Sequence, residues 1–214
     1  MNYQCIIFDC DGVLVDSEEI SNRVLLEMVK ALGVEIEENY ALERFSGTSL
    51  KSIFEYVEQR INKKLPPSFE ADYRRKTFEL FKTDLKPIKG IREVLRRISI
   101  PICVASSGPL DKIKLNLTTT GLLPAFYGNI FSSYEIQSWK PDPGIFLHAA
   151  KEMGFAPEDC LVVEDSIAGI RAARKGGFDV CGFVNQQNTK AFEEEGAIVI
   201  REMEALIGII GMAN

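Results

Sequence analysis

The chain has 214 residues, of which 46% are hydrophobic and 26% are charged, a composition typical of a globular protein with a sizeable core. Its formal net charge of −6 argues against a surface that binds nucleic acid or an anionic membrane, because such surfaces carry an excess of Lys and Arg. We therefore expect neither partner, and an anionic substrate has to be met by cations gathered locally.

The five cysteines indicate a reducing compartment. They are odd in number, lie far apart and show no metal-ligand spacing, which favours buried thiols over disulfides. No apolar run is long enough to cross a bilayer, and the first residues lead directly into a strand rather than a signal peptide. We expect a cytoplasmic monomer.

The first predicted strand runs from Cys5 to Phe8, a segment too short for a helix and apolar enough to be buried on both faces. It ends in Asp9, followed by Asp11 and Gly12. Two carboxylates two residues apart at the end of a buried strand repel each other, so both stay ionised only beside a cation or with a shared proton. An ordinary Asp-Gly turn after a strand is the alternative interpretation.

The stretch that follows shows helical spacing throughout. Asp16 and Ser17 resemble a helix cap, and apolar residues recur at helical intervals up to Leu32. The same spacing predicts three further helices, at residues 42–45, 50–61 and 69–81. Because no strand-like run interrupts these helices, they predict a small helical domain inserted after the first strand. The predicted domains are a Rossmann-like catalytic core, residues 1–15 and 83–214, and a helical cap domain, residues 16–82.

Strands and helices alternate in the rest of the chain. The predicted strands cover residues 100–105, 129–131, 160–163, 179–184 and 197–200. The predicted helices cover residues 91–98, 112–120, 144–153, 167–175 and 202–210. This alternation requires right-handed crossovers between parallel strands. We predict an α/β fold with a Rossmann-like, doubly wound parallel sheet.

Residues suited to chemistry follow four of these strands. In chain order they are Asp9 and Asp11, then Ser106, Ser107 and Gly108, then Lys140, then Glu164 and Asp165. Ligands of a parallel sheet bind at the carboxyl ends of its strands, where all of these residues would lie. Carboxylates from two strands can hold a hard divalent cation, while a hydroxyl, loop amides and a lysine can hold phosphate oxygens. The pattern therefore predicts Mg²⁺ between carboxylates and a phosphate group.

These motifs resemble those of the haloacid dehalogenase superfamily of aspartate-nucleophile phosphatases, over nearly the whole chain. The resemblance rests on the sequence DCDGVL from Asp9, Ser106, Lys140 with Pro141, and Glu164-Asp165 followed by Ser166 and Gly169, all in the family's order. It implies that Asp9 is a nucleophile that forms an aspartyl-phosphate. It also implies that Asp11 is the acid of the first half-reaction and the base of the second.

The resemblance implies roles for the other residues as well. Ser106 would bond a phosphate oxygen with help from backbone amides near Ser107 and Gly108, and Lys140 would neutralise the nucleophile and the phosphate. The implied magnesium ligands are Asp9, the main-chain carbonyl of Asp11, Asp165, and Glu164 either directly or through water.

The helical insertion resembles the α-helical cap of the β-phosphoglucomutase-like and phosphoglycolate phosphatase-like subgroup. This resemblance implies that a loop containing Gly47 and Thr48 contacts the substrate. The implied function is a magnesium-dependent phosphatase, or phosphomonoesterase, acting on a small phosphorylated metabolite, a sugar phosphate or sugar-acid phosphate. The loops at residues 106–109 and 138–143 resemble those of a bacterial phosphatase acting on 6-phosphogluconate.

Two other functions stay open at this point. A β-phosphoglucomutase-type phosphosugar mutase is the main alternative, although Ser21 and Leu50 replace a histidine and an arginine that those mutases carry. A receiver-like signalling domain also gathers acids, a hydroxyl and a lysine at a sheet edge, but it is shorter and has no helical insertion. Asp11 argues against a dehalogenase, because those enzymes lack the second aspartate. Hydrolysis of a phosphomonoester is the expected reaction.

Overall fold

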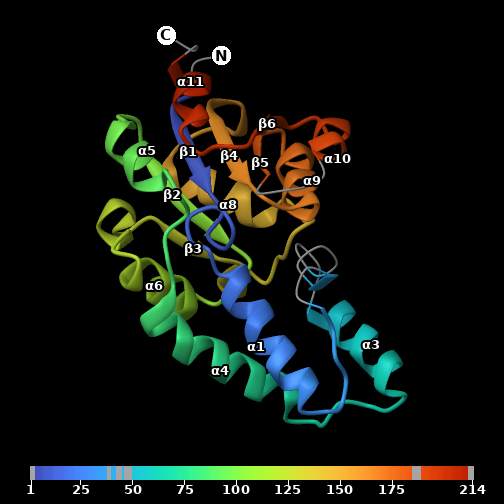
Figure 1. The fold of residues 1–214 in the computed structure, drawn as a ribbon. Helices are drawn as coiled ribbons and strands as arrows, with labels where there is room; N and C mark the ends of the chain where they lie inside the picture. The colour runs from blue at the N-terminus through green and yellow to red at the C-terminus, as the bar shows by residue number, and fades with distance from the viewer. Residues whose placement is uncertain (1–2, 38–39, 42–44, 46–49, 185–188, 212–214) are drawn as a thin grey trace. The chain divides into compact units, whose positions relative to one another are not determined.

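The computed structural model describes residues 3–37, 40–41, 45, 50–184 and 189–211 (Figure 1). The chain divides into two compact units, one formed by Met1–Asp16 with Lys86–Asn214 and the other by Ser17–Leu85. The strands are β1 (Cys5–Phe8), β2 (Ile102–Ser106), β3 (Ile130–Ser132), β4 (Cys160–Glu164), β5 (Asp179–Phe183) and β6 (Ile198–Ile200). The helices of the first unit are α5 (Ile91–Arg97), α6 (Leu110–Thr119), α7 (Ser133–Ile136), α8 (Gly144–Met153), α9 (Ile167–Lys175), α10 (Thr189–Glu194) and α11 (Ala205–Gly211).

The six strands found among the described residues form one sheet in the order β3-β2-β1-β4-β5-β6, with every neighbouring pair parallel. This is the strand order of a doubly wound Rossmann-like sheet, so the predicted fold class is confirmed. From β1 the chain adds β2 and β3 on one side of the sheet, and then returns to add β4, β5 and β6 on the other side. The direction in which strands are added therefore reverses between β1 and β4. Ligands of such sheets bind outside the carboxyl ends of the strands at that reversal.

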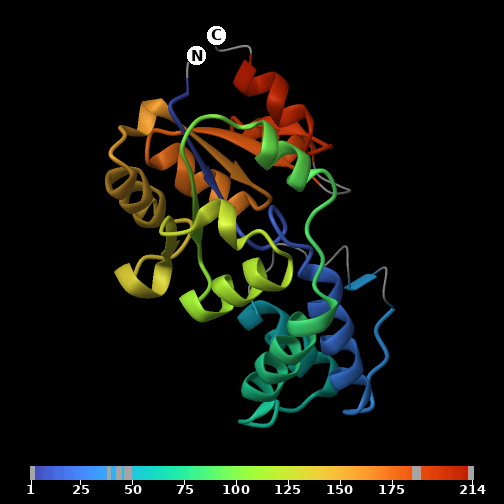
Figure 2. The same ribbon diagram turned by 90° about the vertical axis from the view of Figure 1, so that its left-hand side faces the viewer.

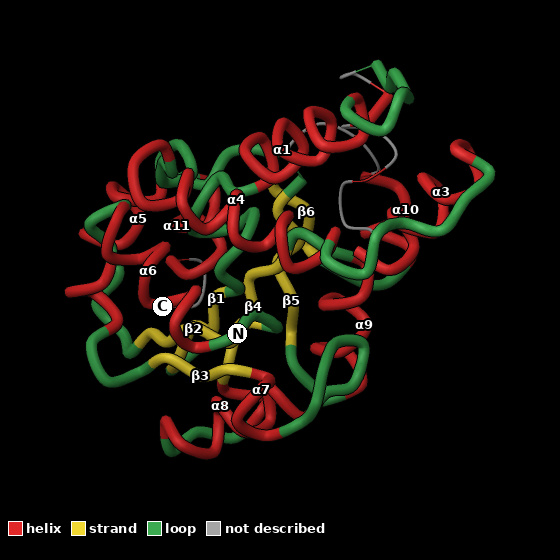
Figure 3. The backbone as a smooth tube through the Cα atoms, turned by 90° about the horizontal axis from the view of Figure 1, so that it is seen from below, coloured by secondary structure: helices red, strands yellow, loops and turns green. Residues whose placement is uncertain are grey.

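Apolar side chains cover both faces of the central strand, as the sequence of β1 predicts. All four residues of β1 are fully buried. Ile7 belongs to a core cluster that includes Ile145 and Phe146 of α8 and Ile170 of α9. Phe8, the next residue of β1, packs edge to face against Phe126, and the centroids of the two rings lie 6.0 Å apart. Figure 3 shows α8 on one side of the sheet and α5 and α11 on the other.

The second unit is helical in the part that the structure describes. Its longer helices are α1 (Glu18–Lys30), α3 (Leu50–Ile61) and α4 (Phe69–Asp84). Helices α1 and α4 pack side by side, as Figure 2 also shows. Ser17 is the N-cap of α1, as the sequence predicts, although its side chain makes no capping hydrogen bond. Leu42, at the start of the predicted helix 42–45, lies outside the described residues.

Some short elements were not predicted. Helices α7 and α10 contain 4 and 6 residues, too few for a helical repeat of apolar residues to show. Short 3₁₀ turns at Leu123–Phe126 and Pro157–Asp159 were missed for the same reason. Helix α6 begins at Leu110 rather than at residue 112, directly after Pro109. None of the described helices is long and apolar enough to cross a membrane.

Replacing Ile7 by alanine tests the central position of β1. The side chain is fully buried between β1 and α8, so we expect Ile7→Ala to lower the free energy of unfolding by about 2–5 kcal/mol. Leu147→Ala on α8 is the matched control, because Leu147 is 39% exposed and its loss should cost no more than about 0.5 kcal/mol. Urea unfolding measures both, and equal effects would contradict the assignment of Ile7 to the core.

Candidate active site

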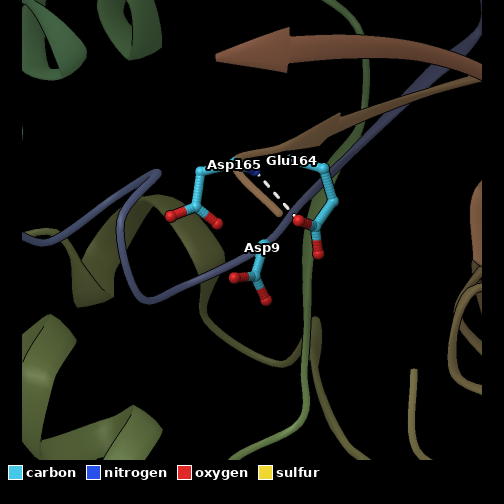
Figure 4. Close-up of side chains that lie close together, drawn as sticks. All are labelled: Asp9, Glu164 and Asp165. Atoms are coloured by element: carbon cyan, nitrogen blue, oxygen red, sulfur yellow. Dashed lines mark hydrogen bonds between the residues drawn. The ribbon is translucent and has the colours of Figure 1, made fainter. Parts of the chain in front are cut away.

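Three carboxylates meet where β1 and β4 end. Asp9 directly follows β1, Glu164 is the last residue of β4, and Asp165 comes next. One oxygen of each carboxylate lies within 4.8 Å of the others, a group able to hold a metal ion. The side chains of Asp9, Glu164 and Asp165 converge on one space in Figure 4. The predicted sheet edge therefore brings carboxylates from two strands together.

Lys140 joins two of these carboxylates. Its Nζ donates to Asp9 Oδ1 at 2.6 Å and also to Glu164 Oε1. The Lys140 side chain is only 7% exposed, that of Asp9 10%, and that of Glu164 is fully buried. The ammonium also lies 4.9 Å from the centre of the Phe146 ring, at a distance where a cation is attracted to the ring face. Lys140 is thus held as a buried cation beside Asp9.

The other oxygen of Glu164 is bound by backbone and hydroxyl donors. Glu164 Oε2 accepts from the amides of Asp165 and Ser166 and from Ser166 Oγ, each at 2.9 Å. Ser166 is also the N-cap of α9, since its Oγ accepts from the Gly169 amide at 3.0 Å. Both Glu164 oxygens therefore have hydrogen-bond donors, which fixes the carboxylate that holds Lys140.

The surroundings shift the pKa values of Asp9 and Lys140 upward. Burial is the main cause that raises the pKa of Asp9 to about 7. The Glu164 and Asp11 charges contribute to this rise, and the Lys140 ammonium opposes it. Burial by itself lowers the pKa of Lys140, but the Asp9 and Glu164 carboxylates outweigh it and leave that pKa above its ordinary value. Lys140 therefore stays charged, while Asp9 loses its proton more readily when further positive charge is near.

Two glycines allow these carboxylates to lie where they do. A Cβ on Gly12 would lie 1.8 Å from Asp165 Oδ2, and Gly12 has a φ of +77°, which favours glycine. A Cβ on Gly169 would lie 1.9 Å from Glu164 Oε1. The turn after β1 and the first turn of α9 therefore approach the carboxylates more closely than any other residue type allows.

The predicted phosphate loop lies on the strand beside β1. Ser106 ends β2, which pairs with β1, so Ser106 and Asp9 lie at the same edge of the sheet. Ser106 is 2% exposed, and its Oγ accepts from the Gly108 amide at 3.1 Å. Ser132 Oγ in turn donates to the Gly108 carbonyl at 2.7 Å. These bonds hold the loop formed by Ser106, Ser107 and Gly108 at the end of β2.

The side chain of Asp11 is bound by two residues that the sequence analysis did not single out. Lys112 Nζ donates to Asp11 Oδ2 at 2.7 Å, and Asn116 Nδ2 donates to Asp11 Oδ1 at 3.2 Å. Both donors lie on α6, where positions i and i+4 share a face. That spacing was visible in the sequence, but nothing local connected it with Asp11. Phe146 was likewise missed as a neighbour of Lys140.

The structure thus brings Asp9, Lys140, Glu164 and Asp165 into one cluster. It puts Ser106, Ser107 and Gly108 at the end of the neighbouring strand and ties Asp11 to α6. The predicted substrate-binding residues Gly47 and Thr48 lie outside the described residues.

Gly169→Ala tests the close packing against Glu164. The added methyl group must displace the carboxylate or the first turn of α9, so we expect a loss of about 1–3 kcal/mol in the free energy of unfolding. Gly208→Ala in α11 is the matched control. Its Cβ would meet nothing within 4 Å, so this second helical Gly→Ala change should stabilise by about 0.4–1 kcal/mol. Urea unfolding measures the free energy of unfolding of both variants. An unchanged value for Gly169→Ala would contradict the close contact between Gly169 and the Glu164 carboxylate.

Comparison with known proteins agrees with this geometry. The sequence model of the haloacid dehalogenase-like hydrolases matches residues 6–183. The 6-phosphogluconate phosphatase of Escherichia coli (strain K12) is 35% identical over 189 residues, which cover 87% of this chain and 85% of that protein. Hexitol phosphatase B of the same strain is 28% identical over 176 residues, 78% of each chain.

Among solved structures, a conserved haloacid dehalogenase-like protein of unknown function from Agrobacterium tumefaciens str. C58 superposes with a TM-score of 0.91. It is 34% identical, and the match covers 100% of both chains. The family and the relatives confirm the expected enzyme class, a hydrolase of the phosphatase type. The chain belongs to the haloacid dehalogenase-like hydrolases.

Proposed function

We propose that this protein is a magnesium-dependent phosphatase that hydrolyses a small phosphorylated sugar or sugar acid through an aspartyl-phosphate on Asp9. The observation that carries the proposal is the buried Lys140 ammonium, 2.6 Å from Asp9 Oδ1 and paired also with Glu164. A carboxylate attacking a phosphate group is repelled by the negative charge of that group. A fixed cation beside the nucleophile reduces this repulsion without having to be reorganised during the reaction.

In the first half-reaction an Asp9 oxygen attacks phosphorus, and the bond from phosphorus to the leaving oxygen breaks. Asp11 gives its proton to that oxygen, so the product leaves as an alcohol. In the second half-reaction Asp11 takes a proton from water, which attacks phosphorus and releases inorganic phosphate and the Asp9 carboxylate. Lys140 would stay paired with the phosphorylated side chain, while Ser106 Oγ and the amides of the loop would bind phosphate oxygens.

The donor set fits a divalent cation. Ionised Asp9, Glu164 and Asp165 carry three negative charges and Lys140 one positive charge, so the cluster has an excess of negative charge that Mg²⁺ would neutralise. Asp9, Asp165 and the main-chain carbonyl of Asp11 would hold the ion, with Glu164 bound to it through water, because both Glu164 oxygens already accept hydrogen bonds. Bound Mg²⁺ would withdraw charge from the phosphate oxygens and favour the ionised form of Asp9.

The substrate class rests on the relatives. A phosphatase named for 6-phosphogluconate and one named for hexitol both act, by their names, on phosphorylated polyhydroxy compounds. We propose a substrate of this kind, with 6-phosphogluconate as the first candidate. The helical unit Ser17–Leu85 would act as a cap that selects the leaving group, with Gly47 and Thr48 in its substrate loop. The five cysteines, all free and buried, support a reducing, cytoplasmic location, and we take the enzyme to be a monomer.

Phosphate release from a panel of phosphate esters tests the proposal. The panel contains 6-phosphogluconate, hexose and hexitol phosphates, phosphoglycolate and nucleotides, each assayed with Mg²⁺ and with EDTA. We expect release only with Mg²⁺, and Asp9→Asn to lower it by about three orders of magnitude or more, as the loss of a nucleophile does.

Asp159→Asn is the matched control for this substitution. Asp159 precedes β4 at the opposite edge of the same sheet, where its carboxylate accepts a hydrogen bond from Gln4 Nε2 at 2.8 Å. The Asp159→Asn variant should therefore release phosphate as fast as the unmodified enzyme. Full activity of Asp9→Asn would refute the proposed nucleophile. Isomerised sugar phosphate in place of inorganic phosphate would identify a phosphosugar mutase instead.

A further inference from the structure

One helix holds both oxygens of the Asp11 carboxylate. Lys112 and Asn116, four residues apart on α6, donate to Oδ2 and Oδ1 at 2.7 and 3.2 Å. They reach Asp11 across 101 and 105 residues of chain, so these are tertiary contacts within the sheet unit. Two donors from one helix face restrict rotation of the carboxylate about its side-chain bonds, because turning it breaks one of the two bonds.

Asn116 is an unusual residue for its position. It is fully buried, next to the fully buried Leu117, on the face of α6 that packs into the core. Its Oδ1 has no hydrogen-bond partner among the described residues. A buried acceptor without a partner costs about 1–3 kcal/mol, so an apolar residue would suit the core better. What an asparagine supplies here, and an apolar residue cannot, is the amide bond to Asp11.

Lys112 connects the Asp11 carboxylate with the loop at the end of β2. A Cβ on Gly108 would lie 3.7 Å from Lys112 Cδ and 3.5 Å from Ser106 Oγ. The Lys112 stem therefore runs beside the loop that would bind phosphate, and its ammonium ends on Asp11. The side chain is 28% exposed, so it can move when a ligand enters, unlike the buried Asn116.

We propose that Lys112 and Asn116 are positioning residues that aim the acid Asp11 at the leaving-group oxygen. This inference rests on the proposed phosphatase function and deepens it. Asn116 holds Oδ1, so the transferable proton is on Oδ2. In the free enzyme Lys112 donates to Oδ2 of the ionised Asp11. When the phosphate ester enters, Lys112 gives way and Oδ2 takes up a proton from solvent. As the bond from phosphorus to the leaving oxygen breaks, the Oδ2 proton passes to that oxygen and its bonding pair stays on Asp11.

Leaving groups that differ in their need for a proton test this role. The first substrate is the alkyl phosphate of the panel that is hydrolysed best, and the second is p-nitrophenyl phosphate. The leaving group of the alkyl ester is an unstable alkoxide unless its oxygen is protonated, whereas p-nitrophenolate is a stable anion that needs no proton. The ratio kcat/KM covers the steps up to the aspartyl-phosphate and is insensitive to its hydrolysis. For Lys112→Met and Asn116→Leu we expect kcat/KM to fall about tenfold or more with the alkyl ester and much less with p-nitrophenyl phosphate.

Two further variants complete the design. Lys114→Met changes an exposed lysine of the same helix and should leave kcat/KM unchanged with both the alkyl ester and p-nitrophenyl phosphate. Lys112→Arg keeps a donor and should restore most of the activity toward the alkyl ester. If Asn116→Leu does not fold, the kcat/KM values of Lys112→Met with the two esters decide the question, because Lys112 is partly exposed and its replacement should not prevent folding.

Equal losses with both esters, or no loss, would overturn the positioning role. Asp9→Asn separates this failure from failure of the proposed function. If Asp9→Asn is inactive toward both esters while Lys112→Met affects them equally, only the positioning role fails. If Asp9→Asn remains active, the proposed mechanism itself is wrong.

Discussion

The buried contact of Lys140 with Asp9 and Glu164 is the constraint on which the rest of the site depends. Burying a carboxylate beside two others is unfavourable, and removing one member of a buried ion pair typically costs about 3–5 kcal/mol. Well-packed apolar residues in such places are often at least as stable as the charges. The cluster is therefore better explained by its chemistry than by its contribution to folding. Ser166 and the cap of α9 hold Glu164, Glu164 holds Lys140, and Lys140 lies against Asp9.

The sheet was predictable because its signals are local. A four-residue apolar segment such as β1, fully buried on both faces, can be recognised without knowing its neighbours. The alternation of such segments with helices then fixes a parallel order, and the rule for strand ends brings Asp9 together with Glu164. Helices of four or six residues, such as α7 and α10, leave no comparable periodic signal.

The parts of the site that escaped prediction depend on tertiary contacts. Lys112 and Asn116 read as ordinary residues of an amphipathic helix, and only the fold shows that they meet a carboxylate more than 100 residues earlier. Phe146 reads as a core residue of α8, which it is, while its ring also lies against the Lys140 ammonium. The predicted roles of Asp9 and Asp11 come from the resemblance to a family, because residue types alone left a simple turn as an alternative.

The points where the chain leaves and re-enters the sheet unit are tied to each other. The Asp16 amide donates to the Lys86 carbonyl at 2.9 Å, and the Ile88 amide donates to the Leu14 carbonyl at 3.0 Å. The base of the insertion is thus closed by backbone hydrogen bonds that belong to the sheet unit alone. Since the entropy of closing a loop grows only slowly with its length, by about 0.6 kcal/mol per doubling, inserts of very different size can be carried at this junction. A lineage can then exchange one insert for another, and acquire a new substrate preference, while the sheet and its carboxylates stay the same.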